Sequence, residues 1–84
     1  MILFTVYDAV ADIYSVPYSA PNTQAGMRSF TDACLEPNSP FYKNPGDYSL
    51  YQVGKFDQDT GKIDAENPSH IMNASDVRSA NAPQ

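Results

Sequence analysis

The segment from Asp57 to Gly61 has the spacing that comes nearest to a calcium-binding loop. Asp57, Asp59 and Gly61 follow one another at alternate positions. An EF-hand loop also needs an oxygen ligand at its fifth position, glycine at its sixth and a bidentate glutamate at its twelfth. Here glycine stands fifth and Pro68 stands twelfth. We therefore interpret the segment as an acidic hairpin turn in which Gly61 supplies a positive φ, and we expect no metal ion or cofactor.

The other side chains that could do acid–base or nucleophilic chemistry stand alone in the sequence. His70 is the only histidine and Cys34 the only cysteine. A catalytic histidine needs convergent partners, and a reactive thiol needs an electropositive, partly exposed setting. Asp32 and Glu36 flank Cys34 instead, so we expect a small buried hydrophobe there. The four glycines lack the spacing of a phosphate-binding loop. The sequence therefore predicts a binding protein with no catalytic residues.

Aromatic side chains are the best candidates for a binding surface. The chain has six tyrosines and four phenylalanines. We expect Tyr51 and Lys55 to project together from one strand, with Tyr48 and Arg28 close by. Rings beside a basic side chain on a sheet are a common way to stack single-stranded nucleic acid. The alternative is that these rings fill the core and the half-buried sheet surface, as tyrosines in strands usually do.

Hydrophobic patterning predicts the elements in the first half of the chain. Residues 2–7 are β-branched and aromatic and indicate a central strand. Residues 13–19 indicate a second strand, irregular or at an edge, because Pro17 cannot donate to a ladder. Between them, Asp8 and Asp12 are expected to cap a turn. Asn22 then caps a helix that runs to about residue 35, and a glycine inside that helix indicates close packing against the sheet.

The second half of the chain is predicted to hold a loop, a hairpin and a tail. Residues 36–47 are rich in proline and are expected to form a long loop. Residues 48–56 and 62–64 form the two strands of the hairpin. The order ββαββ predicts an α+β fold, a mainly antiparallel sheet covered by one helix. This domain spans residues 1–66, and the polar residues 67–84 are expected to form a flexible tail because they offer little apolar surface to bury.

Charge and the N-terminal residues limit the classes of partner. Ten acidic residues against five basic ones give a net charge of −5, which disfavours tight, autonomous binding to nucleic acid and suits contact with basic proteins. The apolar run at the start has no basic flank and is too short for a signal peptide or a membrane span. We therefore expect a cytosolic protein with no membrane role. A homodimer would supply buried area that a core this small lacks.

Three blocks of the sequence, taken in order, resemble one known family. They read Met1-x-Leu3-x-Thr5-Val6-Tyr7-Asp8, Arg28-x-Phe30 and Asp47-Tyr48-x-Leu50-Tyr51-x-Val53-Gly54-x-Phe56-Asp57-x-x-Thr60-Gly61-x-Ile63. Together with the Asn67-Pro68 that follows, they resemble the small nonstructural protein of gokushovirus-like microviruses, which are single-stranded DNA phages. The resemblance covers residues 1–68. Residues 36–46 are longer and richer in proline than the family pattern, and the chain past residue 70 is extended.

The resemblance implies a role inside the infected bacterium. Such a protein is made in the host cytoplasm, is largely absent from the virion, and acts in replication or packaging of the single-stranded DNA genome. It would bind a viral replication or capsid protein, or weakly bind the DNA itself. The alternative is a host-directed protein–protein interaction module, for which an acidic surface and an exposed strand edge are suited. The resemblance supplies no catalytic residues.

Overall fold

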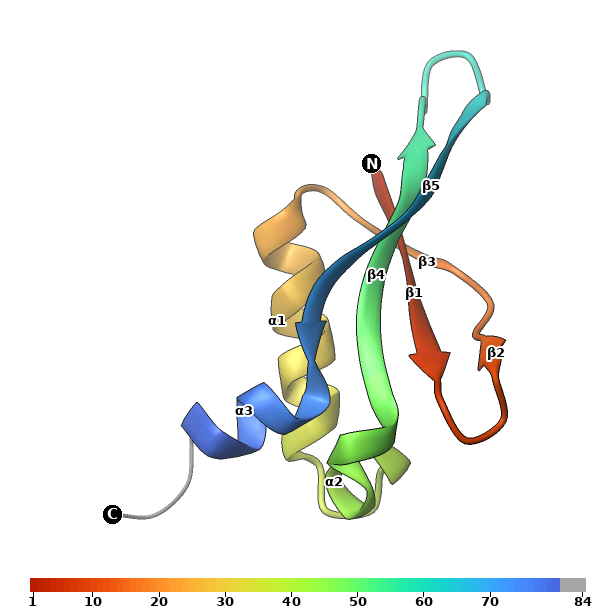
Figure 1. Ribbon diagram of the computed structural model, residues 1–84. Coiled ribbons are helices and arrows are strands. Elements are labelled where there is room, and N and C mark those ends of the chain that lie inside the picture. Colours follow the sequence, from red (N-terminus) through yellow and green to blue (C-terminus); the bar gives the residue numbers. More distant parts are fainter. Residues whose placement is uncertain (81–84) are drawn as a thin grey trace.

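The computed structural model describes the backbone of residues 1–80 and the side chains of residues 1–77. This part of the chain forms five strands, three α-helices and one 3-10 turn. In chain order the elements are β1 (Ile2–Asp8), β2 (Ile13–Tyr14), β3 (Tyr18–Ala20), α1 (Thr23–Leu35), α2 (Pro40–Lys43), the 3-10 turn η1 (Pro45–Asp47), β4 (Tyr48–Phe56), β5 (Ile63–Asn73) and α3 (Ala74–Ala80) (Figure 1).

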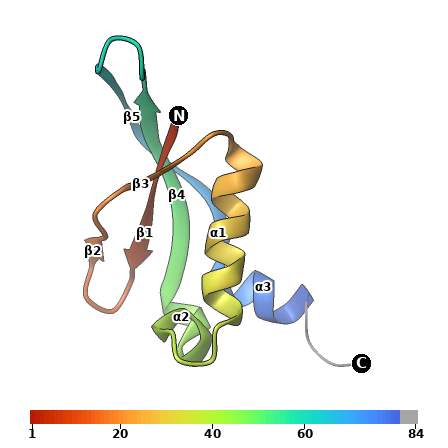
Figure 2. The same cartoon turned by 180° about the vertical axis from the view of Figure 1, so that it is seen from behind.

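The strands form one antiparallel sheet with β1 at its centre. The order across the sheet is β2-β1-β4-β5, and β3 pairs with the same edge of β1 as β2 does. This confirms the predicted α+β fold with a mainly antiparallel sheet. The cover is larger than the single expected helix, because α2 and α3 pack against α1 at the end of the sheet where β4 begins (Figures 1 and 2).

The predicted second strand is broken into β2 and β3, as Pro17 led us to expect. Between them the chain leaves the edge of β1, and Ser15 provides the hydrogen bonds that a regular strand would make. Its hydroxyl accepts from the Val6 amide at 3.0 Å, its amide donates to the Val6 carbonyl at 2.9 Å, and its carbonyl accepts from the Thr5 hydroxyl at 2.7 Å. The central strand therefore keeps its backbone groups satisfied beside an irregular neighbour.

Helix α1 begins and ends as its sequence predicts. The Asn22 side chain accepts a hydrogen bond from the Ala25 amide at 2.8 Å, which is a standard N-cap. Phe30 and Cys34 lie on the buried face of the helix. Gly26 lies directly over the ring of Phe4, where an added Cβ would come within 2.2 Å of a ring carbon. The expected close packing of this glycine is confirmed.

The long loop predicted for residues 36–47 is wrong in part, because α2 and η1 form within it. The Ser39 hydroxyl caps α2 by accepting from the Tyr42 amide at 3.1 Å, and Pro40 takes the first helical position, where its missing N–H costs nothing. The ring of Phe41 then packs between Phe30 and Tyr48, with centroid distances of 5.7 and 4.8 Å. Burial of this one ring explains why a proline-rich segment becomes ordered.

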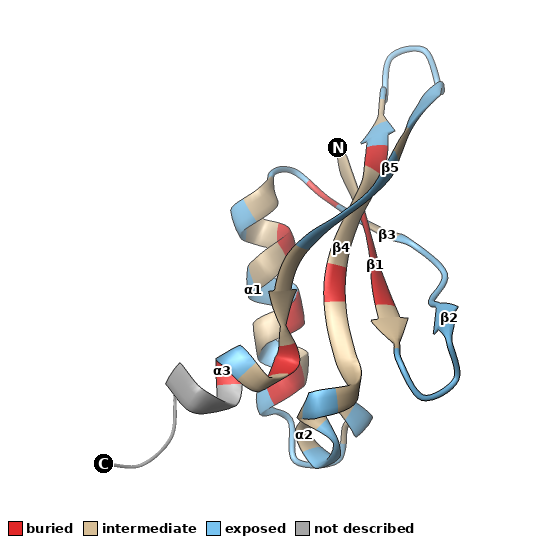
Figure 3. Ribbon diagram, in the orientation of Figure 1, coloured by how far each residue is buried: buried red, intermediate tan, exposed pale blue. Residues whose placement is uncertain are grey.

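A single core lies between the helices and one face of the sheet (Figure 3). Its buried apolar residues come from five elements that are far apart in the sequence. They are Phe4, Val6, Ala20, Phe30, Cys34, Leu50, Ala74 and Val77. The face of the sheet that carries Phe4, Val6 and Leu50 is called the covered face below.

The predicted flexible tail is wrong as far as the side chains are described. The boundary expected after residue 66 falls inside β5, which continues to Asn73, and α3 follows directly. Ala74 and Val77 are 0% and 3% exposed and belong to the core. Backbone pairing with β4 does not require apolar side chains, so a polar sequence can form this strand. Residues 81–84, the end of the predicted tail, lie outside the described residues.

We predict that Gly26→Ala lowers the free energy of unfolding by about 2 kcal/mol. Overpacking against the buried Phe4 ring costs up to about 3 kcal/mol, and the better helix propensity of alanine offsets about 1 kcal/mol of this. Gly46→Ala is the matched control, since an added Cβ there meets nothing within 4 Å. Urea denaturation of both variants measures the difference, and equal midpoints would contradict the packing described.

We also predict that Val77→Ala destabilises the fold by about 1–3 kcal/mol, because it removes two buried methyl groups and leaves a cavity. The control is Ile63→Ala, at a side chain that is 65% exposed. This variant should change stability by less than about 1 kcal/mol. If Val77→Ala is as neutral as its control in thermal unfolding, α3 is not part of the folded unit.

Candidate functional site

The side of the sheet away from the covered face, called the open face below, carries a different set of residues. Side chains alternate along a strand, so Thr5 and Tyr7 point away from their neighbours Phe4 and Val6. Residues directly opposite each other on antiparallel strands share a face. The registers Tyr7↔Tyr14, Thr5↔Tyr51 and Tyr51↔His70 therefore bring side chains of four strands together on the open face.

Four rings form a row across this face, called the ring row below: Tyr14 of β2, Tyr7 of β1, Tyr51 of β4 and His70 of β5. Ring centroids lie 4.8 Å apart for Tyr7 and Tyr14, 5.6 Å for Tyr14 and Tyr51, and 5.4 Å for Tyr51 and His70. Tyr51 stands edge-on to both Tyr14 and His70, with interplanar angles of 80°. Tyr14 and His70 are exposed and the two inner rings are partly buried. The row therefore places exposed aromatic surface on the sheet, where a partner could contact it.

The open face has almost no charge. The strand registers assign it thirteen paired positions, and none of them is Lys, Arg, Asp or Glu. These positions are Leu3, Thr5, Tyr7, Tyr14, Ser19, Ser49, Tyr51, Gly54, Phe56, Ile63, Ala65, His70 and Asn73. The chain has a net charge of −5, so this uncharged surface differs in charge from the acidic turns around it.

A carboxylate nevertheless holds Tyr7, one of the inner rings of the row. The Tyr7 hydroxyl donates a hydrogen bond to Asp12, and this bond, followed by burial and the negative charge of Asp12, raises the pKa of Tyr7 to about 12. Asp12 has a φ of 56°, a conformation that Asp and Asn tolerate better than most residues. Asp8 accepts from the amides of Val10 and Ala11 at 3.0 and 3.2 Å. The predicted turn-capping role of Asp8 is confirmed.

Neighbouring polar groups hold His70 at one end of the row. The His70 ring nitrogen Nε2 lies 2.8 Å from Oδ1 of Asn73, and the Ser49 hydroxyl donates to the same oxygen at 2.8 Å. These contacts fix the plane of the imidazole against Tyr51. Tyr7 and His70 are thus held by hydrogen bonds in addition to packing.

Of the four predicted site residues, only Tyr51 lies in the ring row. The prediction that Lys55 projects with it is wrong. Tyr51 pairs with Thr5 whereas Lys55 pairs with Ile2, three residues away on β1 and therefore on the opposite face. The cause is a bulge in β4 at Val53, an extra residue that reverses the alternation beyond it. On the covered side Lys55 lies 4.0 Å from a Glu66 carboxylate oxygen.

The other two predicted residues also lie away from the row. Tyr48 packs on the covered face against Phe41, and burial, together with Asp8 and Asp47, raises its pKa. Arg28 is an exposed residue of α1. The structure therefore does not bring the expected basic side chains to the aromatic surface.

Sequence reasoning missed the other members of the row. The sequence predicts strands that contain Tyr7 and Tyr14, but no local pattern shows which strands pair or in what register. His70 was assigned to the tail. The alternation Thr5-x-Tyr7 does mark Tyr7 as facing away from Val6, and this is the one signal that was present.

Cys34 and the turn that begins at Asp57 follow the sequence predictions. Cys34 is fully buried, and burial raises the pKa of its thiol to about 11. The Asp57 carboxylate accepts from the amides of Asp59 and Thr60, which lowers its pKa, and Gly61 has a φ of 75°. Across the described residues, no three His, Cys, Asp or Glu side chains are grouped to hold a metal ion, and no helix is long and apolar enough to cross a membrane.

Comparison with known proteins gives the family. A model of the Phage ORF5 protein family matches residues 1–77. The chain belongs to this family. The match ends at Val77, which is also the last side chain that the structure describes and belongs to the core, so the Phage ORF5 unit includes β5 and the start of α3 as well as the whole ring row. The predicted phage origin is confirmed at this level. No curated protein and no solved structure matches the chain significantly.

We predict that Asp12→Asn lowers the pH at which Tyr7 ionises, because it removes the negative charge while keeping a residue that tolerates the positive φ. Between pH 10 and about 12 the folded protein keeps a Tyr7 proton that the unfolded chain releases, so stability falls as pH rises through this range. The variant should lose this part of the dependence. Absorbance of the tyrosinate form, at about 295 nm, measures the ionisation of the tyrosines as pH rises.

Tyr18 provides the internal control for this experiment. Burial raises the pKa of Tyr18 to about 12, and its hydroxyl donates to the Gly26 carbonyl at 2.8 Å, away from Asp12. Tyr18, together with Tyr48, whose pKa is also raised, should therefore still titrate late in Asp12→Asn. Tyr7→Phe should remove the same transition that Asp12→Asn shifts, and an unchanged titration in both variants would contradict the hydrogen bond.

Proposed function

We propose that this Phage ORF5 protein is a nonstructural accessory protein of a single-stranded DNA phage of the microvirus type, acting in genome replication or packaging in the cytoplasm of the infected bacterium. Its role is to bind and not to catalyse. The observation that carries the proposal is the ring row on the uncharged open face. Membership of a phage family and the sequence blocks shared with microvirus nonstructural proteins support the phage context.

The chemistry of the open face favours a viral protein as the main partner. Tyrosine is enriched in protein interfaces, and charged residues are depleted from interface centres. Binding to DNA draws most of its free energy from phosphates neutralised by Lys and Arg. The paired positions of the open face supply none, and Lys55 lies on the other side. A replication or capsid protein therefore fits better than DNA.

Single-stranded DNA is the weaker ligand of the same surface. Bases stack on exposed rings without need of sequence-specific contacts, and Tyr14 and His70 are exposed at the two ends of the row. Binding of this kind would be weak and only slightly sensitive to salt, because few counterions are released. Such stacking would add a weak contact to the DNA that a viral protein partner already binds.

A host-directed interaction module is the second candidate, and a separate feature supports it. Strand β5 has eleven residues and, in the described part of the chain, pairs only with β4. Its outer edge is open to an added strand. A pull-down from host lysate with β5 variants tests this candidate, and recovery of phage proteins alone would count against it.

We predict that the double variant Tyr14→Ala/His70→Ala weakens binding to the phage replication or capsid protein by about 10- to 30-fold, the size expected when hot-spot side chains are truncated. Each candidate partner is purified and titrated against the labelled full chain. Both residues are exposed, so the fold should persist. Arg28→Ala is the matched control, at an exposed residue of α1, and should leave the affinity unchanged.

The same variants are titrated with labelled single-stranded DNA by fluorescence anisotropy at low and at physiological salt. Weak binding that falls in Tyr14→Ala/His70→Ala and not in Lys55→Ala supports stacking on the ring row. Salt-sensitive binding that depends on Lys55 would move the DNA site to the covered side. If neither viral protein nor DNA binds the wild-type chain, the proposed function is wrong.

A further inference from the structure

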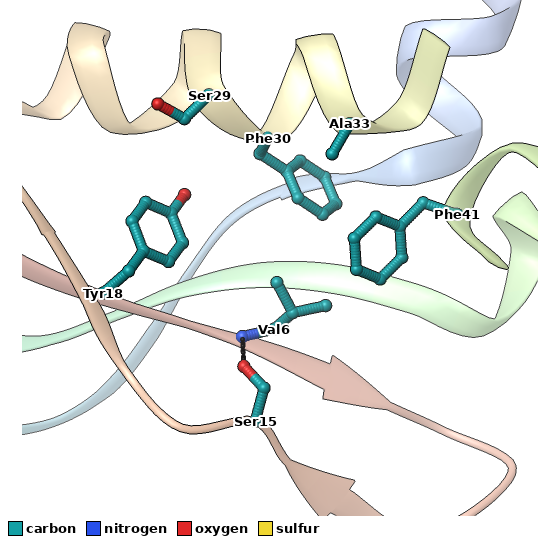
Figure 4. Close-up of a pocket in the computed structure, with 7 residues that line it drawn as sticks. All are labelled: Val6, Ser15, Tyr18, Ser29, Phe30, Ala33 and Phe41. Carbon is teal, nitrogen blue, oxygen red and sulfur yellow. Dashed lines mark hydrogen bonds between the residues drawn. The ribbon is translucent and has the colours of Figure 1, made fainter. Parts of the chain in front are cut away.

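A groove lies on the covered side of the sheet, beside the core and away from the ring row. Two adjoining hollows of about 310 and 190 Å³ form it, and they share Val6, Ser15 and Phe41 as lining residues. Figure 4 shows the larger hollow between α1 above and the chain from Ser15 to Tyr18 below, with the rings of Phe30 and Phe41 at one wall.

Small side chains and the broken strand leave this groove unfilled. Where α1 faces it, the helix presents Ser29 and Ala33, which are too short to reach the opposite wall. The opposite wall is the segment that Ser15 ties to Val6 by its hydrogen bonds. The floor of the groove therefore stays apolar and open to solvent. Exposure of apolar surface to water is unfavourable, and an apolar group that enters the groove removes this cost.

The end of the groove near Tyr48 is negatively charged. Asp8 lines the smaller hollow together with Tyr48 and Ile13. The Ala9 amide donates to the Asp47 carbonyl at 2.9 Å, which places Asp47 beside Asp8 at this end of the groove. Burial, followed by the charges of Asp8 and Asp47, raises the pKa of Tyr48. No lysine or arginine appears among the described residues that line either hollow. A positive charge on a ligand would therefore meet Asp8 with no competing lysine or arginine among these lining residues.

We propose that this groove binds a short peptide segment of a basic protein partner. One large apolar side chain of the segment enters the larger hollow beside the rings of Phe30 and Phe41, and a lysine or arginine next to it pairs with Asp8 and Asp47. The larger hollow is near the lower limit of ligand pockets, about 300 Å³, and holds one such side chain. An apolar anchor next to a charge that sets its direction is a common mode of peptide recognition.

This site goes beyond the proposed function, because it lies on the face of the sheet opposite the ring row. A protein with both surfaces can hold two partners at once. Failure of one site leaves the other intact, so the two proposals are tested separately. Tyr14→Ala/His70→Ala serves here as the variant that should not affect the groove.

The first experiment selects random seven-residue peptides by display on the immobilised full chain. The selected sequences should share one Leu, Ile, Met or Phe next to Lys or Arg. A synthetic peptide with the leading sequence, labelled with fluorescein, is then titrated against the wild-type chain. Replacing its basic residue by glutamate should weaken binding about tenfold or more, since attraction becomes repulsion.

Variants of the chain locate the peptide. Ser29→Phe fills the groove from an exposed position of α1 and should weaken binding at least about tenfold. Gln24→Phe adds the same ring elsewhere on α1, outside the groove lining, and should have no effect. The double variant Asp8→Asn/Asp47→Asn keeps a side-chain acceptor for the turn amides. It should weaken peptide binding about threefold and make the peptide affinity less dependent on salt.

Urea denaturation first confirms that each variant folds. If Ser29→Phe does not fold, Ala33→Leu fills the groove from the next turn of the helix. The proposal is overturned if the selection enriches no shared sequence, if the shared sequence lacks a basic residue, or if binding survives a folded groove-filling variant. Loss of binding in Tyr14→Ala/His70→Ala would assign the peptide to the open face instead.

Discussion

Strand β1 pairs with β4 along its whole length, and both surfaces of the protein depend on that register. On the covered face the pairing sets Val6 beside Leu50, which gives the core its centre. On the open face it sets Thr5 beside Tyr51, which brings Tyr7 within reach of the neighbouring ring. A shift of one residue would exchange the two sets, burying tyrosines and exposing the core. The fold and the ring row are therefore specified by the same hydrogen bonds.

The small size of the core explains why so many short elements contribute to it. A chain of this length buries a modest share of its surface, so apolar side chains from five elements are needed to form one core. Phe41 of α2 extends the core at one end, and Ala74 and Val77 close it beside α1. Gly26 lets the main helix approach Phe4 without an intervening side chain. The groove remains at the one place where α1 presents short residues to a broken strand.

Local patterns in the sequence were enough to predict much of the fold. The apolar run of β1, the Asn22 cap and the turn glycine Gly61 each act within a few residues, so each could be identified without knowledge of the rest. The α+β class followed from their order. Helix α3 also had a local signal that was missed, because Asp76 accepts from the Asn73 amide as in a capping box.

The candidate site was harder to predict because it depends on pairing between distant segments. The bulge at Val53 moves Lys55 to the other face, and the neighbouring Gly54, which indicates a bulge in the sequence, does not show which residue is the extra one. Tyr14 reaches the row only through its pairing with Tyr7. His70 lies in a polar stretch whose strand character comes from β4 and not from its own side chains. Tyr51 alone was identified.

The position of Pro68 in β5 has a consequence for solubility. A long strand at the edge of a sheet is a template on which further chains can add, and it is the usual starting point of fibrils. Proline has no N–H to donate, and Asp64 and Glu66 on the same strand repel a second copy of it. Together they interrupt the edge against stacking of identical chains. The outer edge of β5 is therefore less suited to stacking of identical chains than a regular strand of the same length.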